Sequence, residues 1–206
     1  ASTPWWWRRA KSRAASRSMP AATPRGGAAF PDGMIAAPDR VAPDVRIDVW
    51  SDVICPWCYL GTRRLERAVA AAGEDVAIRY RSFQLDPGIP RGHHTPHAEA
   101  LAATLRTTPE RVREMNRRLI DLGRDHGIDY RFDRYVQANT RDAHRLLHLA
   151  HARGRGPALK DALLRAQFTD GAILDDHDTL VGLAVEAGLD TDEARRVLAS
   201  DEFDDA

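Results

Sequence analysis

Two short alternating segments on either side of a helical segment constrain the fold more than any other feature of this sequence. Residues 45–50 (VRIDVW) and 76–83 (VAIRYRSF) alternate apolar and polar side chains, which is the period of a half-buried β-strand. Between them, apolar residues from Tyr59 to Ala72 recur at helical spacing, and Gly73 is a good helix stop. A strand, a helical crossover and a second strand predict a parallel βαβ unit with a right-handed connection.

The only two cysteines of the chain, Cys55 and Cys58, lie where the first strand meets this helix. Pro56 would take the first helical turn, where its missing N–H costs no hydrogen bond. The spacing would place both sulfurs on one helix face, within reach of a disulfide. Free backbone N–H groups and the helix dipole would lower the pKa of Cys55, the predicted nucleophile, while Cys58 would resolve the mixed disulfide. Pro56 and Trp57 lie between the cysteines and tune the pair without adding charge. We therefore expect its disulfide to be a weaker oxidant than the most strongly oxidising catalytic disulfides.

Two other interpretations of the cysteines stay open. His144 and His148 lie four residues apart on a predicted helix, and with the cysteines they would complete a zinc ligand set. The two halves are far apart in the sequence, unlike those of a zinc finger. The third interpretation, two inert buried cysteines, gives no reason for their place at a helix start. We therefore predict no metal and no cofactor beyond the redox pair, with glutathione as a candidate reductant or co-substrate.

The rest of the chain divides by composition into a tail and a helical part. Residues 1–44, rich in Ala, Pro, Gly and Arg, predict a disordered tail; residues 45–92 predict the βαβ half of a domain; residues 93–206 predict a helical domain. Within that domain we expect a block of helices that extends from about residue 98 to residue 200. The expected helix starts are Thr108-Pro109, Thr140, Gly156-Pro157, Asp178 and Asp190 or Thr191.

The net charge and the hydropathy of the chain limit the partners that it is expected to bind. The formal net charge is zero, which argues against bulk attraction to nucleic acid or membrane, and the 43% hydrophobic content is enough for a core. No apolar run is long enough for a membrane span, and the first residues lack the apolar stretch of a secretory signal. Two cysteines cannot form the disulfide framework of a small secreted domain. We expect a cytoplasmic protein that acts on a protein or small-molecule thiol or disulfide.

Several motifs together resemble the FrnE-type branch of the DsbA-like thioredoxin-fold oxidoreductases. They are SDVICPWCYLG after a short strand, then ANTRDAHRLLHLA and ALLRAQFTDG in the helical part. The resemblance implies an α/β, thioredoxin-like fold with a large α-helical domain inserted after the second strand, and disulfide exchange at Cys55 and Cys58. Because the inserted domain roofs the active site in this family, Asn139, Thr140 and His144 are expected to face the substrate groove.

The resemblance also indicates which other functions the chain could have. The related 2-hydroxychromene-2-carboxylate isomerases and kappa-class transferases share the scaffold but usually carry serine in place of Cys55. We therefore predict a thiol–disulfide oxidoreductase or isomerase. The first alternative is a glutathione-dependent isomerase or transferase, and the second is a non-catalytic or zinc-stabilised helical binding module. The family pattern closes with a Gly-Val-Pro-type segment and further strands, which are expected to be missing here, so a two-stranded sheet would expose an aggregation-prone edge.

Overall fold

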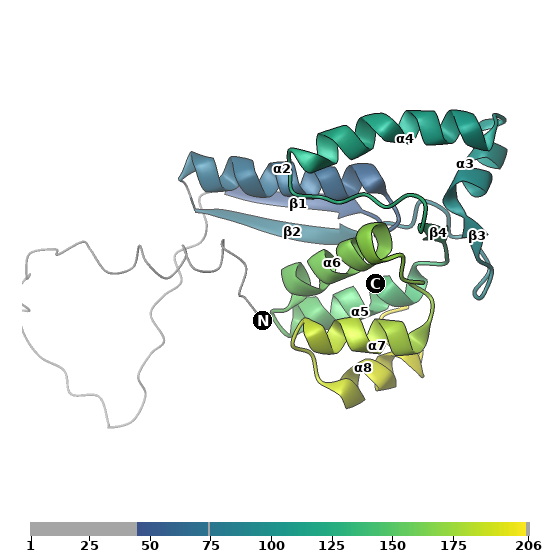
Figure 1. Ribbon diagram of the computed structural model, residues 1–206. Helices are drawn as coiled ribbons and strands as arrows, with labels where there is room; N and C mark the ends of the chain where they lie inside the picture. The colour runs from purple at the N-terminus through teal and green to yellow at the C-terminus, as the bar shows by residue number, and fades with distance from the viewer. Residues whose placement is uncertain (1–44, 74, 205–206) are drawn as a thin grey trace, which may run out of the picture. The chain divides into compact units, whose positions relative to one another are not determined.

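The computed structural model describes residues 45–73 and 75–204, and its centre is a parallel βαβ unit. Strands β1 (Val45–Ser51) and β2 (Val76–Ser82) pair in parallel, in a register that joins Val45 to Val76, and α2 (Pro56–Ala72) connects them (Figure 1). Gly73 ends α2 with φ of 71°, a left-handed conformation that glycine adopts without a steric penalty. The predicted unit is confirmed. The predicted tail, residues 1–44, lies outside the described residues.

A second helical pair follows the loop after β2. It consists of α3 (His97–Leu105) and α4 (Pro109–Arg124), and α4 packs against α2 (Figure 1). The Thr108 hydroxyl caps α4 by accepting a hydrogen bond from the amide of Arg111, as the sequence predicted. Two short strands, β3 (Thr95–Pro96) and β4 (Val136–Gln137), pair antiparallel before α3 and before α5. Two-residue strands are too short to give an alternating pattern, so the sequence did not indicate them.

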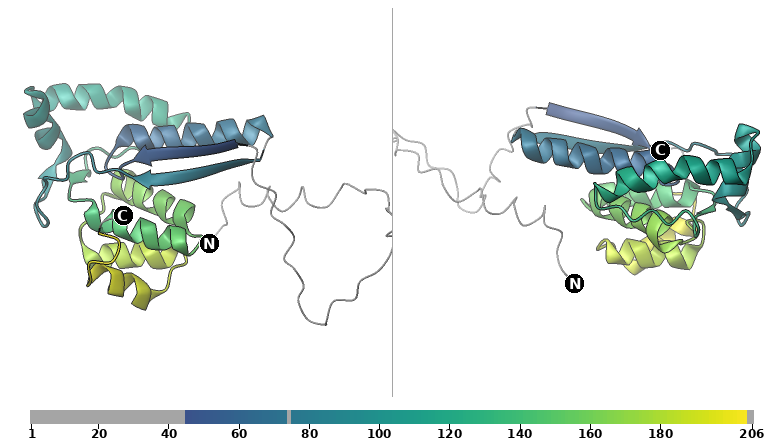
Figure 2. Two further views of the ribbon diagram at one scale, coloured as in Figure 1. Left: turned by 180° about the vertical axis from the view of Figure 1, so that it is seen from behind. Right: turned by 45° about the horizontal axis from the view of Figure 1, so that its top comes forward.

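The remaining helices form a block around one apolar core. They are α5 (Arg141–Ala152), α6 (Gly156–Arg165), the π-helical segment η1 (Ala166–Asp170), α7 (His177–Glu186) and α8 (Thr191–Leu198). Leu146, Leu159, Leu163 and Leu180 are fully buried at its centre. The block and α2 lie on opposite sides of the two strands (Figures 1 and 2). The chain therefore places the cysteine-bearing helix across the sheet from its largest core.

The structure corrects two expectations about the helical part. The helix block predicted for residues 98–200 is interrupted, because residues 126–140 form turns, loop and the short strand β4. Asp176, rather than Asp178, caps α7 by accepting from the amide of Thr179. The described residues 45–73 and 75–204 belong to one compact unit, and the proposed boundary between residues 92 and 93 stays a prediction. No helix in the described ranges is long and apolar enough to cross a membrane.

Candidate active site

Cys55 and Cys58 occupy the first turn of α2. Cys55 is the N-cap residue with an extended backbone, and Pro56 begins the helix. The carbonyl of Cys55 accepts hydrogen bonds from the amides of Cys58 and Tyr59, at 3.0 and 3.2 Å. Both thiols are free and partly exposed. This is the position that the spacing predicted, while the roles of the two cysteines stay predictions.

The two thiols influence each other's ionisation. A hydrogen bond from Cys55 lowers the pKa of Cys58 to about 6, and the same bond, with burial, raises the pKa of Cys55. We expected the lowered pKa on Cys55. The amides of Trp57 and Cys58 favour a Cys55 thiolate, so each of the two cysteines has neighbours that stabilise a negative charge on it. The pair therefore holds one thiolate near neutral pH.

A buried lysine from the helical block lies near this thiolate. Lys160 on α6 is 1% exposed, and its Nζ donates to the hydroxyl of Ser51 at 2.7 Å. Burial lowers the pKa of Lys160 to about 8, while the charges of Cys58 and Asp52 act in the opposite direction. In return, the Lys160 ammonium lowers the pKa of Cys58. Lys160 is thus a cation that stabilises the thiolate from across the sheet.

Asp52 fixes the backbone on both sides of the site. It is fully buried, and its carboxylate accepts from the amides of Val53 and Leu85, both at 2.7 Å. The ring of His144 hydrogen-bonds the same carboxylate, Nε2 to Oδ1 at 3.0 Å. Burial raises the pKa of Asp52, but the hydrogen bonds outweigh it and hold this pKa below its ordinary value. Asp52 therefore connects the end of β1, the loop after β2 and α5 through hydrogen bonds.

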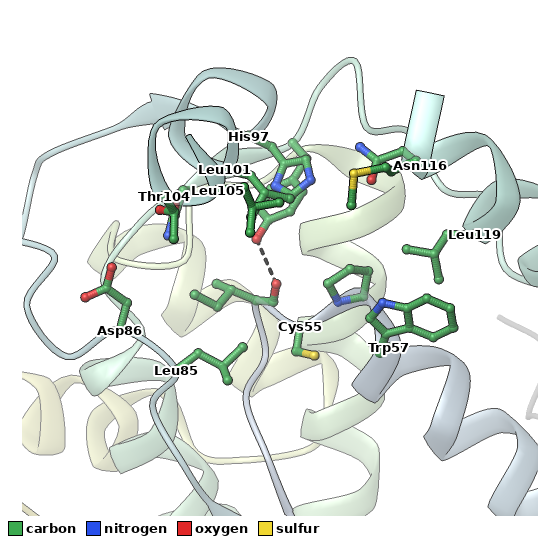
Figure 3. Close-up of a pocket in the computed structure, with 15 residues that line it drawn as sticks. Cys55, Trp57, Leu85, Asp86, His97, Leu101, Thr104, Leu105, Asn116 and Leu119 are labelled. Carbon is green, nitrogen blue, oxygen red and sulfur yellow. Dashed lines mark hydrogen bonds between the residues drawn. The ribbon is translucent and has the colours of Figure 1, made fainter. Parts of the chain in front are cut away.

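Two tyrosines hold the turn before α2. The hydroxyl of Tyr135 donates to the carbonyl of Ile54 at 2.7 Å, the dashed line in Figure 3. The hydroxyl of Tyr130 donates to the carbonyl of Pro56 at 2.6 Å. Tyr130 also packs directly on Gly123 of α4, where any Cβ would meet its ring at 2.6 Å. The non-helical segment at residues 126–140 therefore positions the cysteine turn.

A cavity of about 480 Å³ opens beside Cys55 (Figure 3). Its floor includes Cys55 and Trp57, and its walls come from α3, α4 and the loop after β2, with Leu85, Leu105, Met115 and Leu119 among them. Cys58 does not line this cavity. A ligand in it would reach Cys55 first.

The expected groove residues Asn139, Thr140 and His144 do not line this cavity. All three are buried. Asn139 donates to the carbonyl of Ile89 at 2.6 Å, and Thr140 accepts from Gln84 at 3.3 Å. His144 lines a smaller pocket of about 300 Å³ beside Ser82. These residues lie behind the cysteine turn because the start of α5 faces the end of β1, and their place in a substrate groove stays a prediction.

The predicted zinc alternative lacks a ligand cluster. Among residues 45–73 and 75–204, no group of three or more His, Cys, Asp or Glu side chains converges on one point. His148, the fourth proposed ligand, hydrogen-bonds Ser82 instead, with Nε2 and Oγ 3.0 Å apart. The cysteines and the two histidines therefore do not form one site.

A cysteine pair at the start of the helix in a βαβ unit, beneath helices inserted after the second strand, defines the thioredoxin-like class with a disulfide oxidoreductase fold. The chain belongs to the DSBA-like thioredoxin domain family, whose model matches residues 46–206. The predicted fold class and family are thereby confirmed.

Known proteins show the range of this fold. A probable DsbA oxidoreductase from Streptomyces coelicolor is 41% identical, with a TM-score of 0.71 over 75% of this chain and 68% of that one. The uncharacterized protein YwbO from Bacillus subtilis is 24% identical over 78% of this chain and 75% of its own length. A 2-hydroxychromene-2-carboxylate isomerase shares the fold at 18% identity, with a TM-score of 0.54 over 75% of this chain and 71% of that one.

Sequence reasoning missed Asp52, Lys160 and the two tyrosines. One signal was present for Lys160, since it is one of only two lysines in an arginine-rich chain and lies between buried leucines. Asp52 lies three residues before Cys55, but no sequence pattern distinguishes it from an ordinary loop residue. Tyr130 and Tyr135 carried no signal, because they are more than 70 residues from the groups they contact.

Proposed function

We propose that the chain is a thiol–disulfide oxidoreductase in which Cys55 attacks and Cys58 resolves. The observation that carries this proposal is the pair of free thiols at the start of α2, beside a cavity that Cys55 lines. For Cys55 to attack, its thiol gives up its proton, which the neighbouring Cys58 thiolate can take. The amides of Trp57 and Cys58 then stabilise the Cys55 thiolate.

The reaction has two exchange steps. The Cys55 thiolate attacks one sulfur of the substrate disulfide; a Cys55–substrate bond forms, the substrate disulfide breaks, and the leaving thiolate takes a proton. Cys58 loses its proton and attacks the sulfur of Cys55, which releases the second substrate thiol. The substrate gains two electrons and the protein is left with a Cys55–Cys58 disulfide. The same steps in reverse oxidise a substrate dithiol.

The buried polar groups support this cycle. Lys160 stabilises negative charge on the pair, and Asp52 keeps the strand end and the Leu85 loop in place. We also propose that glutathione is a reductant or co-substrate of the pair. A cytoplasmic location is proposed as well, and a cysteine content limited to the redox pair supports it.

The test is the reduction potential of the pair. The full chain is equilibrated in glutathione buffers, quenched with acid, alkylated and weighed by mass spectrometry. We expect one reversible two-electron transition between about −270 and −120 mV. Cys55→Ser should abolish exchange, and Cys58→Ser should accumulate a mixed disulfide at Cys55. A pair that stays reduced throughout this range would refute the proposal.

A further inference from the structure

Strand β1 has one edge with which no other strand of the described residues pairs. The sheet contains two strands in the order β1–β2, so β2 takes one edge of β1 and the backbone groups of the other edge have no strand partner there. In the left view of Figure 2, β2 lies between β1 and the block of helices α5 to α8, so the block does not cover this edge. An unpaired edge is a template on which another strand can pair.

The side chains of β1 alternate between the two faces of the sheet. One face carries its apolar residues, which are Val45, Ile47 and Val49. Arg46 and Asp48 share the other face and lie one on each side of Ile47. The charge pattern of the strand is therefore inverted about its centre, and an antiparallel copy of β1 presents the opposite charge at each of these two positions.

We propose that two copies of this chain pair through their free β1 edges, antiparallel and centred on Ile47, as a dimer with two-fold symmetry. In this register Ile47 lies opposite its own copy, and Arg46 of each copy lies opposite Asp48 of the other, so both charge pairs are attractive. Moving the centre to Arg46 or to Asp48 places two like charges directly opposite each other, which is destabilising. A slip by one residue sets apolar side chains against the polar face.

The outer edge of β2 lacks this complementarity. The polar face of β2 carries Arg79 and Arg81 and no acidic residue. Antiparallel pairing of two copies centred on Arg79, Tyr80 or Arg81 sets arginine opposite arginine. The charges therefore favour a dimer at β1 over a dimer at β2.

Trp50 adds an aromatic group to the same surface. Its side chain is 64% exposed and shares the face of Arg46 and Asp48. In the register centred on Ile47, Trp50 is the diagonal neighbour of Arg46 of the second copy, within reach of a contact between guanidinium and ring. The dimer therefore covers part of a large side chain that one copy leaves in water.

The inference goes beyond the proposed disulfide exchange and does not depend on it. Each β1 ends at Ser51, shortly before the cysteine turn. Because the two copies of β1 run in opposite directions, the two cysteine turns lie at opposite ends of the joint sheet. Both active sites thus remain open in the dimer.

The experiment measures the association of the full chain by sedimentation velocity over a wide range of concentrations. Reductant is present, so no disulfide between copies can form. We expect a reversible equilibrium between monomer and dimer. Arg46 is exposed, and Arg46→Asp makes both cross-strand pairs repulsive, so it should raise the dissociation constant of the dimer at least about tenfold. Arg117→Asp, the same change at an exposed position on α4, is the control and should leave this constant unchanged.

A mixture of two variants tests the register. Asp48→Arg should also weaken the dimer, and an equimolar mixture with Arg46→Asp should dimerise again, because the acidic pair of one chain then faces the basic pair of the other. Asp48 also pairs with Arg81 at 2.9 Å, so the unfolding free energy of each variant is measured alongside. If Asp48→Arg unfolds, Asp48→Asn takes its place and should bind Arg46→Asp more tightly than that variant binds itself.

Four outcomes would overturn the inference. They are a wild-type chain that stays monomeric, assemblies larger than a dimer, an Arg46→Asp variant that dimerises as well as the wild type, and a mixture of folded variants that stays monomeric. The proposed disulfide exchange would remain in each case, since its test is the reduction potential of the cysteine pair.

Discussion

The βαβ unit and the α5–α8 block differ in how much core each contains. The block encloses leucines with no exposed surface, such as Leu146, Leu159 and Leu163. Every residue of β1 before Ser51 is only partly buried or exposed, and Trp50 is 64% exposed. The cysteines lie in the region with less core, and the helical block supplies buried groups that stabilise the site. The stable region and the reactive region of this chain are thus distinct but joined by polar contacts.

The largest expected effect is on the free energy of unfolding, and it tests whether the block is packed more tightly than the sheet. Leu163→Ala in the block should lower the free energy of unfolding by about 2–5 kcal/mol, because a fully buried side chain leaves a cavity. Ile47→Ala on β1 removes the same number of carbons from a half-buried site and should cost clearly less. Denaturant unfolding of the two variants measures the loss of unfolding free energy in each. Equal costs would show that the sheet is as well packed as the block.

A second prediction concerns the contact between the two regions at Lys160. Lys160→Met removes the buried cation, so the pKa of the Cys58 thiol should rise above about 6, while the larger lowering by the hydrogen bond with Cys55 remains. Because the reduced form loses stabilisation, the reduction potential should become more negative. The pKa is measured by thiolate absorbance as a function of pH, and the reduction potential by equilibration with glutathione. Arg165→Met, a charge removal on the same helix but near the surface, is the control and should change neither.

Lys160 also gives the stability a pH dependence of known sign. Its pKa falls from 10.5 to about 8 on folding, so between these values the unfolded chain binds the proton that the folded chain has lost. The contribution of Lys160 to the free energy of unfolding therefore increases from about pH 8 to 10.5. The Met variant should lack this increase. An identical pH profile for the two proteins would show that Lys160 does not titrate in this range.

The smallest expected effect concerns His144 and Asp52. His144→Ala removes one hydrogen bond to the buried carboxylate and should cost about 1–3 kcal/mol at neutral pH. The folded-state pKa of Asp52 lies below its ordinary value, so its contribution is present above that ordinary value and is lost as pH falls through the folded one. Without His144 this loss should begin at higher pH, which acid unfolding measures. His148→Ala, one turn further along α5, should not move it, because His148 bonds Ser82.

The amino-acid sequence by itself determined the parallel βαβ unit, the place of Cys55 and Cys58 at the start of α2, and the cap of α4 at Thr108. Each follows from residues a few positions apart, through alternation, helical spacing or a local hydrogen bond. Only the tertiary structure brought Lys160, His144, Tyr130 and Tyr135 to the cysteine turn, and it buried Asn139 and Thr140 outside the cavity beside Cys55. These contacts join residues that are 50 to 110 positions apart, and which face of α5 or α6 meets the strand end depends on how whole helices pack, which no local pattern records.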